Sequence, residues 1–458
     1  MEAVRADEAP TPRITRLIDL LAGRGGSRAE AIRHATVLVG GTAAGQAIAL
    51  IATPVLTRLY SPAEFGLLAL VIGFLNVAGV IVTLRYELPV PSATTARGAD
   101  RIVTLALIAA VPGSIAAAIV LYSLIRWNVL SYAVLPWWTP LAAAPMLLAA
   151  AAFTVSRAWA IRAHRFGDVS RLLIAQGSGR AVVPIVWRIG IGGGLAGLLA
   201  GEIVGRLVGC GRLLRIAWPR LRPWLRTSRV KHLWSEARRN WQMPIIAVPS
   251  ALLDVLGISL PSILLANEFG TKEAGLFLLV QRLIFLPITL VGASAADVFH
   301  VRIAAVLRAD PTRVRGAVLA LAGRLLTGGA LCMLPVAMLA PKVLPFVLGH
   351  AWSEAGSLMV MLVPWSIATL VVSPVSRLLV VVGKNQRKLI YYDGLAIAAV
   401  VGPIVGSTTI GADFHHTVLA ISLSQSAAYI VYFALILSAA PGRATAAVIP
   451  SPSKGEVS

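Results

Sequence analysis

The chain alternates long apolar stretches with short polar connections, and twelve of the stretches are roughly twenty residues long. A helix needs about twenty apolar residues to cross the hydrocarbon core of a bilayer, and backbone polar groups in lipid must bond within the segment. The period-two alternation of a membrane barrel is absent. The pattern predicts an all-α polytopic membrane protein with about 12 transmembrane helices, over Ala35–Leu56, Phe65–Leu84, Ile102–Ile125, Val134–Val155, Leu172–Trp187, Leu195–Ala217, Met243–Ala266, Ala274–Ala295, Ala317–Leu348, Gly356–Val382, Leu389–Ile410 and Thr417–Leu437.

Composition supports the membrane assignment. Of 458 residues, 57% are hydrophobic and 13% are charged, whereas a soluble domain carries about a quarter charged residues. The net charge of +21 could indicate a nucleic-acid-binding protein, but that function needs a basic face on a soluble domain. The twelve spans leave no room for such a domain, so no nucleic-acid partner is expected.

The basic residues predict the orientation. With a cytoplasmic N-terminus, and with residues within six positions of a span end counted with the adjoining loop, 32 of the 41 Lys and Arg residues fall in inner segments and five in outer ones, while four lie deeper within spans. Such a bias is the positive-inside signal, so we expect a multi-pass protein of the cytoplasmic (inner) membrane with both termini in the cytoplasm. Topology and attraction to anionic lipid explain most of the inner basic residues.

Two short matches indicate an internal repeat. Ala63–Val71 and Lys272–Val280 share Glu, Gly, Leu, Leu and Val in register, and Val155-Ser-Arg recurs at Val375-Ser-Arg. Six spans per repeat make the halves parallel, and transporters built this way place substrate between their halves. We therefore expect two six-helix lobes around a central cavity. The segments are 1–34 (cytoplasmic, with either a short amphipathic helix or a disordered tether), 35–217 (N-lobe), 218–241 (basic linker), 242–438 (C-lobe) and 439–458 (cytoplasmic tail).

Four arginines lie within predicted spans and more than six residues from either span end: Arg180, Arg206, Arg282 and Arg324. Each charged side chain at a helix centre costs about 2.5–3.5 kcal/mol on insertion scales, so these residues should face partners, water or an interface. Arg324 lies nearest a span end, from which its long side chain could reach the membrane surface. Because guanidinium stays charged and bonds phosphate oxygens bidentately, the four are candidate ligands of a phosphate-bearing substrate.

Intramembrane acids are fewer. Glu202 stands four residues before Arg206 and should share its helix face, either as a structural ion pair or as a coupling group. Asp254 lies on a polar stripe and is a candidate for coupling to H⁺ or Na⁺. Asp297 and Asp393 lie nearer predicted span ends, so we interpret them as boundary residues.

The runs Leu56–Gly66 (LTRLYSPAEFG) and Arg85–Pro89 (RYELP) resemble the opening of polysaccharide-biosynthesis flippases of the O-antigen type. Those proteins belong to the multidrug/oligosaccharidyl-lipid/polysaccharide exporter superfamily. The resemblance implies alternating access that moves a polyprenyl-diphosphate-linked oligosaccharide to the outer leaflet, with a polysaccharide polymerase or glycosyltransferases as partners. It adds Arg58 and Arg85 as candidate substrate residues and Glu64 and Glu87 as candidate gating residues. Each of these four also has a local role at a loop or span end.

Other functions remain as alternatives. A multidrug exporter of the same superfamily should have cavity acids in excess of arginines, and the spans contain the reverse. A membrane-embedded glycan polymerase should have a large outer loop, and a glycosyltransferase an Asp-x-Asp motif in a soluble domain. Neither feature occurs in the sequence, nor does a phosphate-binding glycine loop followed by Lys and Ser or Thr. A non-enzymatic transporter without a cofactor or bound metal is therefore expected.

Overall fold

The computed structural model describes residues 28–225, 230–382 and 386–440, and these ranges contain helices and no strands. The expected amphipathic helix near Ile14–Leu21 and most of the tail lie outside them. The N-lobe comprises α2 (Arg28–Leu59), α3 (Pro62–Val82), α4 (Ala96–Arg126), α5 (Thr139–Arg162), α6 (Phe166–Gly190) and α7 (Leu195–Leu221). The linker contains α8 (Val230–Arg239). The C-lobe comprises α9 (Val248–Phe269), α10 (Thr271–Ala309), α11 (Val314–Leu348), α12 (Ala355–Val375), α13 (Arg377–Val382), α14 (Gln386–Ile410) and α15 (Phe414–Ala439).

The two lobes have the same internal packing. In the N-lobe, α2 packs on α6, α6 on α7, α5 on α7 and α4 on α5. Their counterparts in the C-lobe are α9 on α14, α14 on α15, α12 on α15 and α11 on α12. The repeat inferred from short sequence matches is therefore a repeat of structure, with parallel halves.

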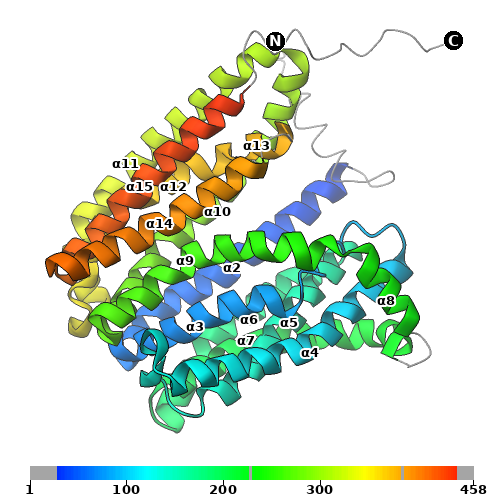
Figure 1. Ribbon diagram of the computed structural model, residues 1–458, viewed down its shortest axis with the longest axis horizontal. Helices are drawn as coiled ribbons and strands as arrows, with labels where there is room; N and C mark the ends of the chain where they lie inside the picture. The colour runs from blue at the N-terminus through cyan, green and yellow to red at the C-terminus, as the bar shows by residue number, and fades with distance from the viewer. Residues whose placement is uncertain (1–27, 226–229, 383–385, 441–458) are drawn as a thin grey trace, which may run out of the picture.

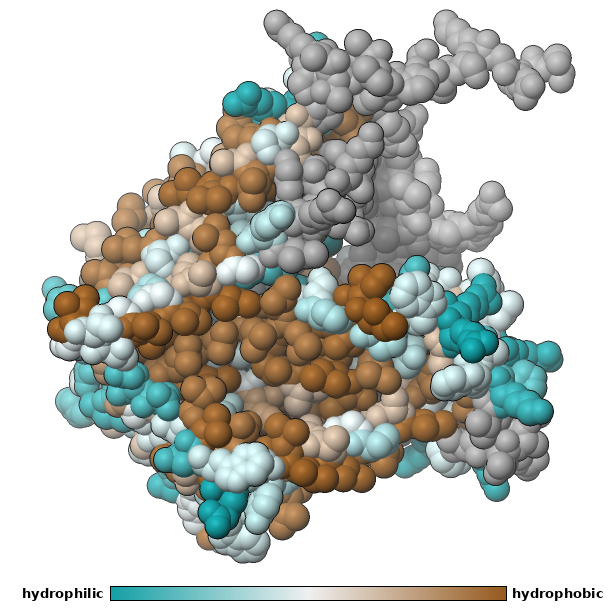
Figure 2. All heavy atoms as spheres, in the orientation of Figure 1, coloured by the Kyte–Doolittle hydropathy of each residue, from teal (hydrophilic) through white to brown (hydrophobic). Residues whose placement is uncertain are grey.

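Ten of the described helical segments are long and apolar enough to cross a membrane. Helices α6 and α7, the fifth and sixth of the twelve expected spans, are not among them, although they contain 25 and 27 residues. Both carry several charged side chains, which lower their apolar character. Hydrophobic side chains form a broad band across the molecule, and hydrophilic ones gather toward its two ends (Figure 2). This distribution fits helices that cross a bilayer.

Most expected spans agree with observed helices to within a few residues. The fourth does not: Val134 lies in a short 3₁₀ turn (Val129–Val134), and α5 begins only at Thr139. The eighth continues well past its expected end at Ala295, to Ala309, and the tenth is divided into α12 and α13 at Ser376. The four boundaries that separate the N-terminal segment, the two lobes, the linker and the tail stay predictions.

The lobes meet at one end of the molecule and lie apart at the other, which carries α8 and α13 (Figure 1). At the closed end the Trp352 indole nitrogen donates to the Thr57 carbonyl oxygen at 2.8 Å. The Phe65 ring meets the Trp352 ring edge-on at 5.1 Å, and the Arg58 guanidinium lies 3.4 Å from the Phe346 carbonyl oxygen. All three contacts join the N-lobe to the C-lobe.

Helices α3 and α10 cross at the closed end with almost no space between their backbones. A Cβ added at Gly66 would lie 1.7 Å from the Thr271 carbonyl oxygen, and one added at Gly275 would lie 1.8 Å from the Pro62 carbonyl oxygen. Gly66 and Gly275 are the matching glycines of the sequence repeat. Pro62 and Thr271 are likewise equivalent positions, so the crossing lies on the axis that relates the lobes, and only glycine fits there.

The two sides of this crossing differ. Helix α9 of the C-lobe packs along α3 of the N-lobe, where Gly73 faces Ile263. The equivalent pair, α2 and α10, makes only sparse contact. The lobes therefore pack closely along α3 and α9 and make few contacts along α2 and α10.

We expect Gly66→Ala and Gly275→Ala to force the closed end apart, since an ordinary carbon contact needs about 3.5–4 Å. Spin labels at Ser61 and Ser353, with Cys210 and Cys332 replaced, would report longer distances in both variants. Gly79→Ala is the control, because a Cβ at Gly79 meets nothing within 4 Å. Unchanged distances in both crossing variants would contradict the packing argument.

Candidate functional site

The charged side chains of α6 and α7 meet inside the N-lobe. Arg180 on α6 binds Glu202 on α7 through two contacts, from its Nε to Oε1 at 2.7 Å and from its terminal nitrogen to Oε2 at 2.8 Å. Arg206, one turn further along α7, contacts the same Oε2 at 3.3 Å. The expected Glu202–Arg206 pair is therefore confirmed, with Arg180 as a second partner.

Glycines adjacent to these residues bring the two helices together. A Cβ added at Gly179 would lie 2.2 Å from the Cα of Gly205, so the backbones of α6 and α7 touch beside Arg180 and Arg206. Small residues that permit such an approach are typical of helix packing in lipid. The short interhelical distance allows one carboxylate to reach both guanidinium groups.

A third guanidinium approaches from the other lobe. Arg282 on α10 is close enough to interact electrostatically with Glu202 and Arg180. Glu202 is buried, with 7% of its side chain exposed, whereas Arg180 and Arg206 keep 25% and 17%. We name Arg180, Glu202, Arg206 and Arg282 the arginine cluster. One carboxylate faces three guanidinium groups, so the cluster has two positive charges in excess, and its chemistry suits an anion.

A cavity of about 180 Å³ adjoins the cluster and has Arg206 in its wall. It lies among α3, α5 and α7, and polar and apolar side chains line it in similar measure. Its polar residues are Asn76, Thr83, Arg85, Glu87, Thr154 and Arg206. The cavity extends the positively charged site toward hydrogen-bonding groups.

Arg85 and Glu87 enter this cavity from an irregular segment after α3. Leu84 and Arg85 have φ angles of +49° and +58°, a left-handed conformation that costs non-glycine residues about 1–3 kcal/mol each and recurs at functional sites. The strained turn aims Arg85 at Glu87, 3.5 Å away, and Glu87 is only 5% exposed. Two expected site residues are thus brought to the same cavity as Arg206.

Asp254 on α9 faces Asp393 on α14, and their carboxyl groups lie within hydrogen-bonding range. Arg85 of the N-lobe is near enough to Asp254 to interact electrostatically. Asp393 lies near the start of the span Tyr391–Ile410, as expected for a boundary residue, but its side chain is buried, with 9% exposed. The side chain of Asp297 lies outside the described residues.

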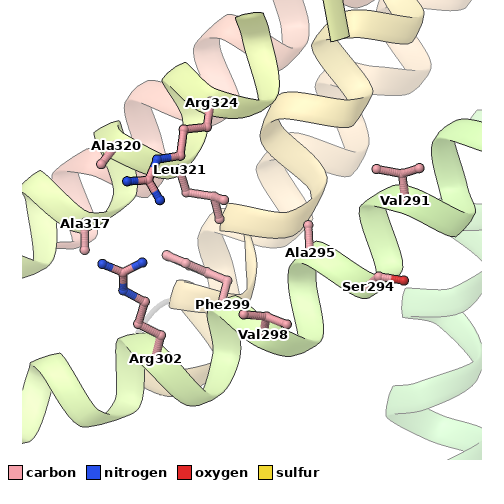
Figure 3. Close-up of a pocket in the computed structure, with 10 residues that line it drawn as sticks. All are labelled: Val291, Ser294, Ala295, Val298, Phe299, Arg302, Ala317, Ala320, Leu321 and Arg324. Atoms are coloured by element: carbon pink, nitrogen blue, oxygen red, sulfur yellow. The ribbon is translucent and has the colours of Figure 1, made fainter. Parts of the chain in front are cut away.

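The remaining expected site residues lie elsewhere. Arg58 is at the closed end, and Glu64 caps the first turn of α3 by accepting from the Ser61 backbone N–H at 2.8 Å. Glu64 also contacts Arg188 of the same lobe at 3.4 Å. Arg324 lines a separate pocket between α10 and α11 (Figure 3). These three residues do not join the arginine cluster.

Sequence reasoning missed Arg302, which faces Arg324 across that pocket (Figure 3). We expected the eighth span to end at Ala295 and placed Arg302 in a loop. The apolar residues Val298, Phe299, Ile303 and Val306 recur at helical spacing beyond that point and would have indicated a longer helix.

A sequence model described as "Polysaccharide biosynthesis protein" matches residues 55–357. The chain belongs to the polysaccharide biosynthesis protein family. This match begins near the end of α2 and includes the arginine cluster, the cavity and Asp254, whereas α14, with Asp393, lies beyond it. A comparison with curated proteins found no match.

Solved structures similar to this family member are transporters. An inward-facing multidrug resistance MATE family transporter of the MOP superfamily has 14% identity, a TM-score of 0.59 and coverage of 93% of this chain and 98% of its own. An outward-facing one has 13% identity, a TM-score of 0.52 and coverage of 94% and 98%. A MOP superfamily transporter from Pyrococcus furiosus is described as having a binding pocket of reverse polarity that suggests a different function. It has 16% identity, a TM-score of 0.53 and coverage of 94% of this chain and 99% of its own. At such identities the likeness establishes the two-lobed fold.

We expect Glu202→Gln to destabilise this family member strongly, because it leaves three guanidinium groups without their carboxylate. Removing one partner of a buried ion pair costs about 3–5 kcal/mol. Thermal unfolding in detergent measures the effect. Glu268→Gln, at an exposed position near the end of α9, is the control, and equal midpoints for the two variants would contradict the expectation.

Proposed function

We propose that the protein is a flippase that moves a polyprenyl-diphosphate-linked oligosaccharide from the cytoplasmic to the outer leaflet of the inner membrane by alternating access. The arginine cluster carries the proposal. The cluster has two excess positive charges and draws on both lobes, since Arg180 and Arg206 come from one lobe and Arg282 from the other. A diphosphate offers several oxygens to bidentate guanidinium groups.

The separation of α2 from α10 suits the lipid part of this substrate. A polyprenyl chain is most stable in the bilayer, so its carrier needs a side opening through which the chain can stay in lipid while the head group enters. Contact between α2 and α10 is sparse, whereas α3 and α9 are sealed together. Helix α10 forms one edge of this opening and also carries Arg282, so a head group that enters there meets the cluster.

The cavity beside Arg206 suits part of the glycan. Its volume of about 180 Å³ is smaller than an oligosaccharide, but Asn76, Thr83 and Thr154 give it hydrogen-bonding groups next to the cluster. A sugar attached to the diphosphate would reach these residues first. The rest of the glycan then extends toward the end where the lobes lie apart, which is the cytoplasmic end in the orientation that the basic residues predict.

Coupling to an ion gradient is assigned to Asp254 and its neighbour Asp393. A carboxyl pair inside the membrane holds a proton or a cation more readily than two separate charges would allow. Arg85 interacts with Asp254 across the lobes and contacts Glu87 in the cavity. Protonation at Asp254 would therefore change the attraction between the lobes beside the substrate site.

A second candidate is a multidrug exporter, favoured by the similar structures, which include multidrug resistance transporters. Cationic compounds would meet a cluster with a positive excess and be repelled. Anionic compounds remain compatible with the site. Transport of a fluorescent dianionic dye, without transport of lipid-linked diphosphate, would favour this candidate over the flippase.

Arg180→Ala and Arg282→Ala are each expected to lower translocation of lipid-linked diphosphate oligosaccharide in proteoliposomes at least tenfold. The reason is loss of a charge-assisted, bidentate contact. Arg126→Ala, exposed at the end of α4, should keep full activity. Folding is checked by gel filtration, and undiminished transport by both cluster variants would remove the proposed contact.

Asp254→Asn should abolish the dependence of transport on the ion gradient, because an amide cannot take up or release the proton. Rates are compared in proteoliposomes with and without a pH or Na⁺ gradient. Asp310→Asn, in the turn between α10 and α11, is the control. A gradient response that persists in Asp254→Asn would exclude Asp254 as the coupling group.

A further inference from the structure

The pocket between α10 and α11 is separate from the arginine cluster and has its own chemistry. It has a volume of about 390 Å³, and its walls are apolar apart from Ser294, Arg302 and Arg324. The two guanidinium groups point toward each other across it (Figure 3). Among the described residues no ion pair involves Arg302 or Arg324. Two like charges that converge in apolar surroundings repel each other, and an anion between them would remove that repulsion.

The depth of the pocket matches the head-group region. Counted from the closed end, Arg302 lies about 46 Å along α10 and Arg324 about 36 Å from the end of α11 at Leu348, at 1.5 Å per residue. A bilayer measures about 30 Å across its hydrocarbon core and about 40–45 Å with head groups. Both lengths exceed the thickness of the hydrocarbon core, so the two arginines are expected at the level of the head groups.

The pocket walls suit an acyl chain. Val291 and Val298 on α10 are 55% and 63% exposed, and together with Phe299 and Leu321 they line the pocket toward the membrane interior. Helices α10 and α11, although consecutive, contact each other only sparsely, while α11 packs closely on α12. A ligand with a charged head and an apolar tail would fill the gap and join the two helices.

We propose that this pocket binds an anionic glycerophospholipid, whose phosphate lies between Arg302 and Arg324 and whose acyl chain lies along the apolar walls. Guanidinium forks bond phosphate oxygens bidentately, and two of them from facing helices hold one phosphate on both sides. The lipid is a structural link between α10 and α11. The assignment does not rest on the proposed transport function.

The test measures thermal unfolding of the full chain in detergent, with and without added phosphatidylglycerol. The midpoint of the natural protein should rise by several degrees, and Arg302→Gln/Arg324→Gln should lose most of that rise. Arg313→Gln/Arg315→Gln removes the same charge from the turn before α11 and the start of that helix, outside the pocket, and should keep the rise. Arg302→Lys/Arg324→Lys retains charge without the guanidinium fork and should keep only part of it.

Counting of bound lipid by native mass spectrometry provides a readout independent of stability, with one phosphatidylglycerol fewer expected on Arg302→Gln/Arg324→Gln. If Arg302→Gln/Arg324→Gln and Arg313→Gln/Arg315→Gln lost equal amounts of bound phosphatidylglycerol, the proposal would be overturned in favour of nonspecific electrostatic attraction. Displacement of phosphatidylglycerol by undecaprenyl phosphate at much lower concentration would also overturn it, since the pocket would then belong to a polyprenyl lipid. Undiminished binding of phosphatidylglycerol to Arg302→Gln/Arg324→Gln would likewise overturn the proposal.

Discussion

The backbone contact between α3 and α10 is the constraint on which the arrangement of the lobes depends. Gly66 and Gly275 lie at equivalent places in the two repeats, and each faces a carbonyl oxygen of the other helix. The helices touch through their main chains, without side chains between them that could adjust. This contact fixes the relative position of the lobes at the closed end. Beside it, Trp352 packs against Phe65 and donates a hydrogen bond to the Thr57 carbonyl oxygen.

The α3–α10 crossing is symmetric, but the two helix pairs on either side of it, α3–α9 and α2–α10, differ in how closely they pack. Two related lobes could seal equally along α3–α9 and along α2–α10, yet only the first pair packs closely. An opening on one side of a membrane protein is unnecessary for a water-soluble solute that enters from an end. Helix α10 also contributes to two sites with positive charge, through Arg282 in the arginine cluster and through Arg302 in the pocket with Arg324. Helix α10 therefore takes part in the lobe contact, in the sparse contact with α2 and in both arginine-lined sites.

The sequence was sufficient to predict the two-lobed helical architecture, because the length of the hydrophobic stretches and a short repeat can both be read directly from it. It was also sufficient for Glu202 and Arg206, since their spacing of four fixes a shared helix face. It could not assign Arg180 to the same carboxylate, because that contact depends on how closely Gly179 lets α6 approach α7. The pairing of Asp254 with Asp393 likewise depends on helices far apart in the chain. The family resemblance made Arg58 a candidate substrate residue and Glu64 a candidate gating residue. The fold places both at the closed end, away from the arginine cluster.

The α6–α7 hairpin has a consequence for how the chain reaches its membrane topology. Each helix alone lacks the apolar character of the ten segments that are long and apolar enough to cross a membrane. Helix α6 alone would bring Arg180 into the hydrocarbon core without its carboxylate partner, whereas Glu202 and Arg206 already pair within α7. Once the hairpin closes, the Glu202 carboxylate is bonded to Arg180 and Arg206, and the desolvation cost of both arms falls together. We therefore expect α6 and α7 to enter the membrane together as a hairpin, with Arg180 already paired with Glu202.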